Sequence, residues 1–325
     1  MTESVRPTES NRRPPLSVMI DQRLRAGAVA LGGSFCRRHT DYLLAAQGRS
    51  GGFAGPDGEA DPYYTRFALH ALMVLGLPPA APAWASAAGW LKAWRRPMTS
   101  VVECLDVWQS LHFLEAVGLV PLEECRRRLW RDEASGLLAA CRTADGAVTL
   151  VPGGASSPYY AFLASMCYDL IGQPMPDRDR AVDAVRACST SDGGFAGHPG
   201  APVGQASPTA AAICFLSGAE AMDEATAGGS AAFLASLQRP EGGLAAHPIA
   251  GAADLLSTFT GLYALATIGR TGMLKLGPLG RFLRGAEEPG GGFRPVAAGG
   301  RADVEYTFYG VAALSLLADM VASIR

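Results

Sequence analysis

The sequence predicts an all-α fold, a closed α/α toroid of about twelve helices, and three observations lead to it. Glycine-rich loops recur along the chain at a near-constant spacing. The segments on both sides of each loop have the apolar periodicity of helices, and the helix after each loop is apolar almost all round. Of the 325 residues, 49% are hydrophobic and only 18% are charged, which suits an extensive buried core.

The repeated loop is the first of these observations. Its glycine pairs begin at residues 193, 242 and 291, two equal steps of 49 residues. A spacing of 20 to 50 residues is typical of repeat architectures. A weaker copy surrounds Asp145-Gly146, and a copy near residue 98 has lost its glycines. The clear copies are SGGFAGPDG (50–58), DGGFAGHPG (192–200), EGGLAAHP (241–248) and GGGFRP (290–295).

A second marker follows each loop: a polar residue and, four positions later, a threonine. Both lie just before an apolar helical segment, so the polar residue is placed to cap that helix. In the two weaker repeats the apolar pattern puts Glu103 and Ser157 at the capping position. The clear pairs are Asp61 and Thr65, Gln205 and Thr209, Asp254 and Thr258, and Asp303 and Thr307.

Each unit therefore contains a helix, a glycine turn and a second helix. The first helix of the pair is amphipathic, as in residues 178–189, and glycine supplies the positive φ of the turn. The second is apolar on most sides, as in residues 210–216 and 311–317, and must be covered on most sides. Six pairs can achieve this by closing into a ring with the more apolar helices inside. A linear solenoid is the competing arrangement.

The rest of the chain adds few further features. Residues 1–30 are predicted to be a flexible N-terminal tail without a secretory signal, and residues 31–325 to be one toroid domain. The net charge of −2 does not suggest a nucleic-acid partner, and no uninterrupted apolar run reaches the length of a transmembrane segment. Seven scattered cysteines predict reduced thiols in a cytoplasmic protein.

The order GGF–x–G–x–P, then an acidic residue, then T–F–x–G–x–x–A–L resembles the prenyltransferase and squalene-cyclase repeat superfamily. The length and the closing stretch DVEYTFYGVAALSLL (303–317) are most similar to the β subunit of protein prenyltransferases, particularly the Rab geranylgeranyl type. The resemblance implies a toroid that binds an isoprenoid or an isoprenoid diphosphate and that pairs with an α-helical partner subunit.

The resemblance also implies a zinc site, and the sequence departs from it. Asp254 stands at one ligand position, but Leu256 and Tyr306 stand where the family has cysteine and histidine. Leucine offers zinc no donor atom. We therefore expect no metal and no other cofactor at this place, with Asp254 as a retained carboxylate.

The diphosphate pocket that the resemblance implies is altered in the same way. Gln205 stands at its histidine position, and His247 stands at its arginine position. The lysine position falls on Ala250 or Gly251. A diphosphate needs several fixed cationic donors, so we expect at most a weak contact from His247.

Aromatic residues gather just after the capping positions and predict an apolar cavity for an isoprenoid chain. Their faces could also stabilise a cationic carbon. Each ring taken singly could equally pack between helices. The set comprises Tyr63, Tyr64, Trp108, Tyr159, Tyr160, Phe259, Tyr306, Phe308 and Tyr309.

Three functions follow from these features. The leading interpretation is a transferase similar to the prenyltransferase β subunit, with an isoprenoid cavity and without the usual zinc and diphosphate groups. The second rests on Asp303-Val304-Glu305-Tyr306-Thr307, which resembles the acid motif of class II terpene cyclases and makes Asp303 or Glu305 the proton donor. The third is a non-catalytic scaffold that binds a lipid or a protein.

Overall fold

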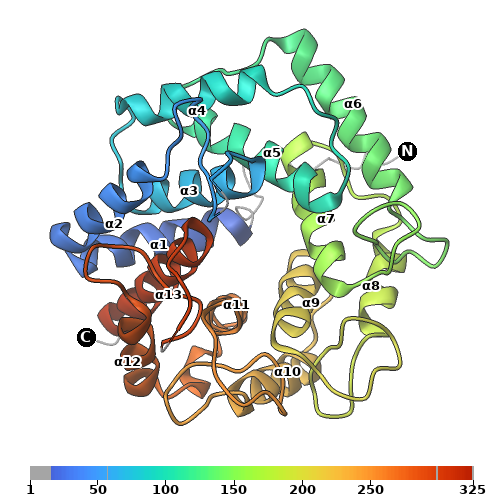
Figure 1. Ribbon diagram of the computed structural model, residues 1–325. Helices are drawn as coiled ribbons and strands as arrows, with labels where there is room; N and C mark the ends of the chain where they lie inside the picture. The colour runs from blue at the N-terminus through green and yellow to red at the C-terminus, as the bar shows by residue number, and fades with distance from the viewer. Residues whose placement is uncertain (1–15, 57, 298, 324–325) are drawn as a thin grey trace, which may run out of the picture.

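The computed structural model describes residues 16–56, 58–297 and 299–323, and these residues form a ring of helices (Figure 1). One 3₁₀ turn, Thr271–Met273, accompanies the α-helices. The α-helices of the described residues are α1 (Leu16–Leu31), α2 (Gly33–Ala45), α3 (Pro62–Val74), α4 (Pro82–Ala93), α5 (Val101–Ala116), α6 (Glu124–Ala140), α7 (Pro158–Ile171), α8 (Arg178–Arg186), α9 (Ala206–Gly218), α10 (Glu224–Ser236), α11 (Leu255–Thr267), α12 (Leu276–Ala286) and α13 (Val304–Ser323).

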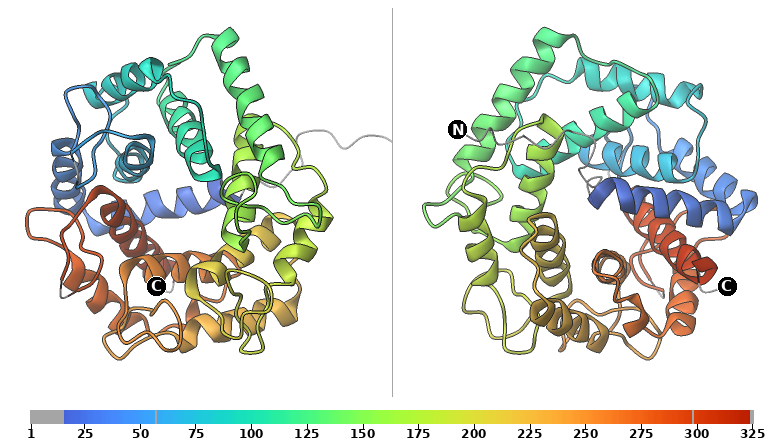
Figure 2. Two further views of the ribbon diagram at one scale, coloured as in Figure 1. Left: turned by 45° about the vertical axis from the view of Figure 1, so that its right-hand side comes forward. Right: turned by 180° about the vertical axis from the view of Figure 1, so that it is seen from behind.

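The helices lie in two concentric layers. The odd-numbered helices α3 to α13 form the inner layer, and each contacts the next around the ring; α13 contacts α3 and closes it. The even-numbered helices form the outer layer: α2, α4, α6, α8 and α12 each pack against the inner helix that follows them in the chain, and α10 packs against α9. The further views in Figure 2 show the same two layers obliquely and from behind. The predicted all-α toroid is confirmed, and its six helix pairs form a closed ring and not an open solenoid.

The inner helices are apolar almost all round because neighbours cover them on both sides and an outer helix covers the back. α13 is the one helix of the described chain with the length and hydropathy to cross a membrane, and 67% of its apolar window is buried inside the ring. Burial against the other inner helices accounts for this composition.

The glycine loops join each repeat to the next one. The first glycine of each pair has positive φ, for example +86° at Gly193 and +111° at Gly242. A Cβ at Gly242 would overlap the backbone carbonyl of Pro278, in the outer helix of the following repeat. Glycine is therefore required both by the backbone conformation and by the close approach of the next repeat.

The repeated threonine has a common partner in each clear repeat. The Oγ1 of Thr209 accepts a hydrogen bond of 2.8 Å from the backbone N of Phe195 in the preceding loop, and Thr258 accepts one of 2.9 Å from Leu244. These threonines are completely buried. The marker thus ties each glycine loop to the inner helix of its own repeat. The other two bonds are Phe53 N to Thr65 at 3.0 Å and Phe293 N to Thr307 at 3.2 Å.

The prediction of a flexible tail over residues 1–30 was wrong for its second half. Residues Leu16–Leu31 form α1, which packs along α13 and crosses the back of the ring (Figure 2). Ile20, Leu24 and Ala28 are buried in this contact. Their spacing is helical, but the polar stretch before them masked it. Residues 1–15 lie outside the described part of the chain.

Candidate functional site

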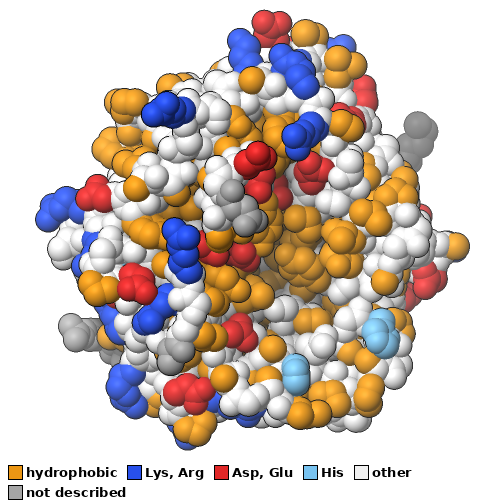
Figure 3. All heavy atoms as spheres, in the orientation of Figure 1, with side chains coloured by type: hydrophobic (Ala, Val, Ile, Leu, Met, Phe, Trp, Pro, Cys, Tyr) orange, Lys and Arg blue, Asp and Glu red, His pale blue; other side chains and the backbone are white. Residues whose placement is uncertain are grey.

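A cavity of about 350 Å³ lies on the axis of the ring, within the usual size range of ligand sites. All six inner helices line it. Figure 3 shows the hollow from the side where the inner helices begin; its wall is mostly hydrophobic, with acidic side chains around it. On the inner helices, the residues that line the cavity stand two, five, six or nine positions after the N-cap. This spacing places them on one face of each helix. α3 contributes Tyr63, Arg66, Phe67 and His70, and α5 contributes Val102, Leu105, Asp106 and Gln109.

Aromatic rings form much of the wall. Phe67, Phe259, Phe308 and Tyr309 make one cluster from α3, α11 and α13, in which Phe259 and Tyr309 stack with ring centroids 5.2 Å apart. Phe308 lies 5.5 Å from Phe67 and 5.4 Å from Phe259. Such rings bury the methyl and methylene groups of a ligand and present π faces to positive charge.

Charged groups are concentrated on the α3 and α5 side of the cavity. The Nε of Arg66 donates to Oδ1 of Asp106 at 2.5 Å, and the exposed fractions of the two side chains are only 11% and 3%. The guanidinium of Arg66 also lies over the ring of Phe67, 3.8 Å from its centroid. Burial raises the pKa of Asp106 to about 6, against the opposing charge of Arg66. Asp106 can therefore hold a proton near neutral pH.

Glu305, from α13, is the second carboxyl group of the wall. The hydroxyls of Tyr63 and Tyr309 both donate to its Oε1, at 2.7 and 2.9 Å. Burial, with the charge of Glu305 next, raises the pKa of Tyr63 far above its usual value, so Tyr63 remains a donor. No described residue bonds Oε2 of this lining residue.

Polar groups also occupy the far end of the cavity. This end lies nine residues after the N-caps, about 10 Å along the helices from the lining residues that stand two positions after the N-caps. His70 lies between the rings of Phe113 and Phe308, and its Nε2 is 2.9 Å from Oδ1 of Asp21 on α1. Gln109 is 8% exposed, and its Oε1 is buried without a hydrogen-bond partner among the described residues. α1 thus contributes to the polar end of the site.

The structure brings together fewer than half of the residues predicted for the site. Those that line the cavity are Tyr63, Tyr159, Phe259, Phe308, Tyr309 and Glu305. These residues come from four different inner helices. Tyr63, Tyr159 and Glu305 stand two positions after the N-caps of their helices, and the other three stand five or six positions after them, one helical turn further on. Leu256 lies in the wall as well.

The remaining predicted residues do not line the cavity. Asp254 and Asp303 are N-caps: Asp254 accepts from Ser257 N at 2.7 Å and from Ser257 Oγ at 2.8 Å, and Asp303 accepts from Tyr306 N at 2.8 Å. Burial raises the pKa of Asp303 to about 6. Gln205 occupies the N-cap position of α9 without a side-chain capping bond.

Four aromatic residues and His247 also lie elsewhere. Trp108 is 1% exposed and packs away from the cavity, with Arg127 over its ring. Tyr64 lies against the loop at Gly55. His247 lies in the loop before α11, where its carbonyl accepts a hydrogen bond from Arg239. Tyr160 and Tyr306 pack as half-buried residues against the core.

The most important residues that the sequence analysis missed are Arg66 and Asp106. It placed Glu103 at the capping position of α5, but Ser100 is the cap and accepts from Glu103 N at 3.1 Å. With Ser100 as the cap, the offset of six that selects Phe67 in α3 selects Asp106 in α5. The spacing that identifies Asp106 is present in the sequence. This repeat has lost its glycine loop, however, so the start of α5 could not be located from the sequence.

The zinc ion that the resemblance implies does not fit the residues present. Both carboxylate oxygens of Asp254 are engaged in the cap, and Leu256 offers no donor atom. In the part of the chain that the structure describes, no three His, Cys, Asp or Glu side chains come close enough to hold a metal ion.

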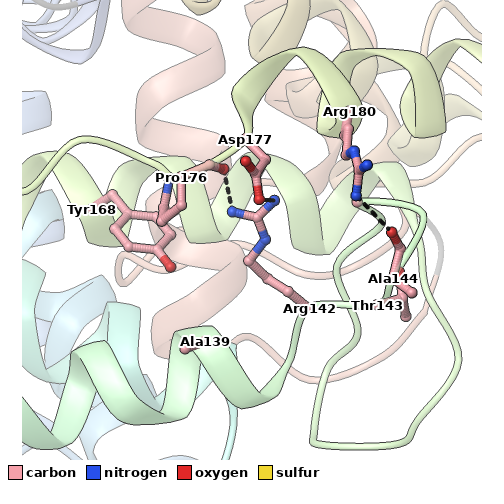
Figure 4. A pocket seen from close by; sticks show the side chains of 9 residues that line it. Ala139, Arg142, Thr143, Ala144, Tyr168, Pro176, Asp177 and Arg180 are labelled. Carbon is pink, nitrogen blue, oxygen red and sulfur yellow. Dashed lines mark hydrogen bonds and ion pairs between the residues drawn. The ribbon is translucent and has the colours of Figure 1, made fainter.

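A second pocket, of about 310 Å³, lies on the outside of the ring between α6 and α8. Figure 4 shows that its two arginines already have protein partners. Arg142 donates to the carbonyl of Pro176 and lies 3.8 Å from Asp177, and Arg180 donates to the carbonyl of Ala144 at 3.2 Å. The axial cavity, with its free polar atoms and apolar wall, is the better candidate.

Comparisons with known proteins agree with this fold. The solved structure of Candida albicans protein geranylgeranyltransferase-I complexed with GGPP has a TM-score of 0.66 at 13% identity, over 86% of this chain and 90% of that chain. The type II terpene cyclase MstE from Scytonema has a TM-score of 0.54 at 15% identity, over 95% and 99%. A variant of it in complex with geranylgeranyl dihydroxybenzoate (substrate) has a TM-score of 0.58 at 15% identity, over 94% and 99%. At these identities the likeness establishes the fold.

The family itself follows from the sequence. No curated protein matches the chain significantly. A family model of the prenyltransferase alpha-alpha toroid domain matches residues 35–85, 107–226 and 153–324. The chain therefore belongs to the prenyltransferase alpha-alpha toroid domain family.

Proposed function

We propose that this protein binds an isoprenoid chain in the axial cavity and cyclises it by protonating one of its alkenes. The single observation that carries the proposal is Asp106, a carboxyl group that is 2% exposed, lies in the wall of an apolar cavity and has a pKa raised to about 6. A buried acid beside aromatic surfaces is suited to deliver a proton to carbon, because water is excluded and the cation that forms is stabilised by π faces.

Each step can be assigned to a residue of the cavity. Arg66 holds Oδ1 of Asp106, so the proton transferred is the one on Oδ2. It forms a C–H bond at one alkene carbon, and the cation left at the other carbon is attacked by the next alkene, which closes a ring. The final cation loses a proton to Oε2 of Glu305, whose Oε1 is held by Tyr63 and Tyr309. The substrate gains one proton and loses one, so the product is its isomer. Exchange with water after product release removes the proton from Glu305 and returns one to Asp106 before the next turnover.

This assignment differs from the proton donor that the sequence analysis considered. Asp303 has a raised pKa but caps α13 outside the cavity wall. Glu305 lies in the wall, and its Oε1 already accepts hydrogen bonds from two tyrosine hydroxyls. We therefore assign Asp106, whose pKa is raised by burial, as the acid and Glu305 as the acceptor of the final proton.

The transferase interpretation has less support in the site. Its chemistry needs several cations around a diphosphate, and Arg66 is the one Arg or Lys among the described residues of the cavity wall. The fold likeness to geranylgeranyltransferase-I does not distinguish the two reactions, because the terpene cyclase has the same fold.

Product analysis tests the proposal. The protein is incubated with all-trans geranylgeraniol, and cyclic isomers of unchanged mass are sought by gas chromatography and mass spectrometry. We expect Asp106→Asn to lower their formation at least about 10³-fold while geranylgeraniol still binds, because the amide cannot donate a proton to carbon. Asp132→Asn, which changes an exposed carboxylate of α6, is the matched control.

Two outcomes contradict the proposal. Cyclic products at unchanged rate from Asp106→Asn would exclude Asp106 as the acid. Binding of geranylgeraniol without any product would leave the cavity as a lipid-binding site and favour the scaffold interpretation.

A further inference from the structure

The guanidinium of Arg66 is only partly used by the protein. Its Nε donates to Asp106, but no described residue accepts a hydrogen bond from Nη1 or Nη2. Both nitrogens are absent from the set of fully buried unpartnered atoms, so they border the cavity that Arg66 lines. A guanidinium has five N–H donors in a planar fork. Four of them are therefore available to a ligand.

A second donor lies next to this fork. Tyr159, at the first lining position of α7, is 38% exposed and lines the cavity at its mouth, and no described residue bonds its hydroxyl. Arg66, Asp106 and Glu305 all lie close enough to Tyr159 to act on the pKa of its hydroxyl, which burial raises. The hydroxyl thus remains protonated at neutral pH and can donate.

The opposite wall has a different character. α9 presents Ser207, Ala210, Ala211 and Cys214, which leave room and offer little polar chemistry. An isoprenoid body therefore has space along α9, while its polar end would find donors on α3 and α7.

We propose that Nη1 and Nη2 of Arg66, together with the hydroxyl of Tyr159, bind a carboxylate or similar oxygen acceptor at the polar end of the substrate, inside the ring. This inference rests on the proposed function, because it takes the ligand to be an isoprenoid. It adds that the isoprenoid carries an acidic head group, which is recognised on the α3 and α7 side of the cavity, between its mouth at Tyr159 and the wall at Arg66. Charge-assisted bonds to a planar guanidinium are among the strongest hydrogen bonds in proteins.

Binding of such a head group would also favour the protonated form of Asp106. A ligand carboxylate shares the positive charge of Arg66 with Asp106 and so weakens the effect that favours the ionised form of Asp106. The other charged or titratable groups around this pair are Asp61 and Tyr63 of the α3 repeat, Glu103 of α5, Tyr159 and Cys167 of α7, and Glu305 and Tyr309 of α13. The substrate would thereby promote protonation of the group that attacks it.

Calorimetric titration of the protein with two probes of the same chain tests the inference. Geranylgeranoic acid carries a carboxylate at pH 7, and geranylgeraniol carries a hydroxyl. We expect the acid to bind at least about tenfold more tightly, which corresponds to about 1.4 kcal/mol. In buffers of different ionisation enthalpy, binding of the acid should be accompanied by proton uptake, and binding of the alcohol should not.

Variants locate the effect. Arg66→Gln combined with Asp106→Asn removes the guanidinium without leaving a buried carboxylate unpaired, and should bind both probes within about twofold of each other. Asp106→Asn alone keeps the guanidinium, so it should keep the preference for the acid but lose the proton uptake. Arg66→Lys keeps the positive charge but loses the planar pair of Nη groups. It replaces the double variant if that variant does not fold. We expect its preference for geranylgeranoic acid over geranylgeraniol to be several-fold smaller than that of the wild-type protein.

The outcomes separate this inference from the proposed function. Equal affinity of the wild-type protein for both probes, or a preference that survives removal of the guanidinium, overturns the head-group site while leaving isoprenoid binding intact. Failure of both probes to bind overturns the proposed function and the inference together.

Discussion

At the residue scale, the reaction depends on a proton that Asp106 holds only in part of the pH range. Burial raises its pKa to about 6, against the charge of Arg66, and the proposed chemistry needs the protonated form. We therefore expect kcat/KM to be constant below about pH 6 and to fall roughly tenfold per pH unit above it. Product formation measured from pH 5 to pH 8 checks this. A rate that rises through pH 6 would mean that the ionised carboxylate acts as a base.

The residues of the site were predictable only as far as the repeat register was clear. In the repeats that keep their glycine loops, the positions of Tyr63, Phe259 and Glu305 follow from the spacing after the cap. In the repeat that has lost its loop, nothing fixed the start of α5, and Asp106 was missed. Hydrogen-bond partners such as Tyr63 and Glu305 come from the first and last inner helices. Only closure of the ring brings them together.

At the scale of the element, the buried threonines should matter more for stability than their size suggests. Thr258→Val keeps the shape but leaves the backbone N–H of Leu244 without its acceptor. We expect the free energy of unfolding to fall by about 1–3 kcal/mol, the cost of an unsatisfied buried donor. Urea unfolding followed by circular dichroism measures it.

A second threonine provides the control. Thr267 donates to the carbonyl of Tyr263, one turn earlier in its own helix, and its other contact is Sγ of Cys214 at 4.0 Å, so no backbone N–H depends on it. Thr267→Val should therefore cost less than about 0.5 kcal/mol. Equal losses in the two variants would show that the bond to the loop has no special role.

The helices themselves were well predicted because their apolar spacing repeats six times, so that each copy supports the assignment of the others. α1 was missed because it belongs to no repeat. Its buried face, with Ile20 and Leu24, is recognisable only once α13 is known to lie beneath it. Gly27 shows how close this contact is, because a Cβ there would overlap the backbone of Ser315.

At the scale of the whole molecule, stability depends on the junction where the sixth repeat meets the first. His39 of α2 is completely buried; its Nδ1 accepts from the backbone N of Gly292 at 3.1 Å, and its Nε2 lies 3.1 Å from Glu287. Arg38 and Arg284 also bond to Glu287. The cluster joins residues about 250 positions apart, so it forms only in the closed ring.

This junction should make the ring sensitive to acid. Burial raises the pKa of Glu287, but the hydrogen bonds from His39, Arg284 and Arg38 outweigh it and lower the pKa from 4.5 to about 2. The stabilisation is therefore complete above about pH 4.5 and is lost as the pH falls through 2. Glu287→Gln should lower the free energy of unfolding at pH 7 by about 2–4 kcal/mol and reduce its change between pH 4.5 and pH 2. An unchanged acid profile in this variant would place the acid sensitivity elsewhere.

The last glycine loop gives the sharpest test of closure. Gly291 has a φ of +95°, and a Cβ there would overlap the carbonyl of Arg38 in the first repeat. Gly290, its neighbour, has no atom within 4 Å of such a Cβ and no positive φ. Gly291→Ala must therefore strain its backbone and push α2 away from the loop. We expect it to lower the free energy of unfolding by about 3 kcal/mol or more, and Gly290→Ala to change it by less than about 0.5 kcal/mol.

Because Glu305 and its partner Tyr63 lie on opposite sides of the same junction, Gly291→Ala should also weaken geranylgeraniol binding. A variant that opens the junction yet binds the ligand normally would show that the cavity does not depend on closure of the ring.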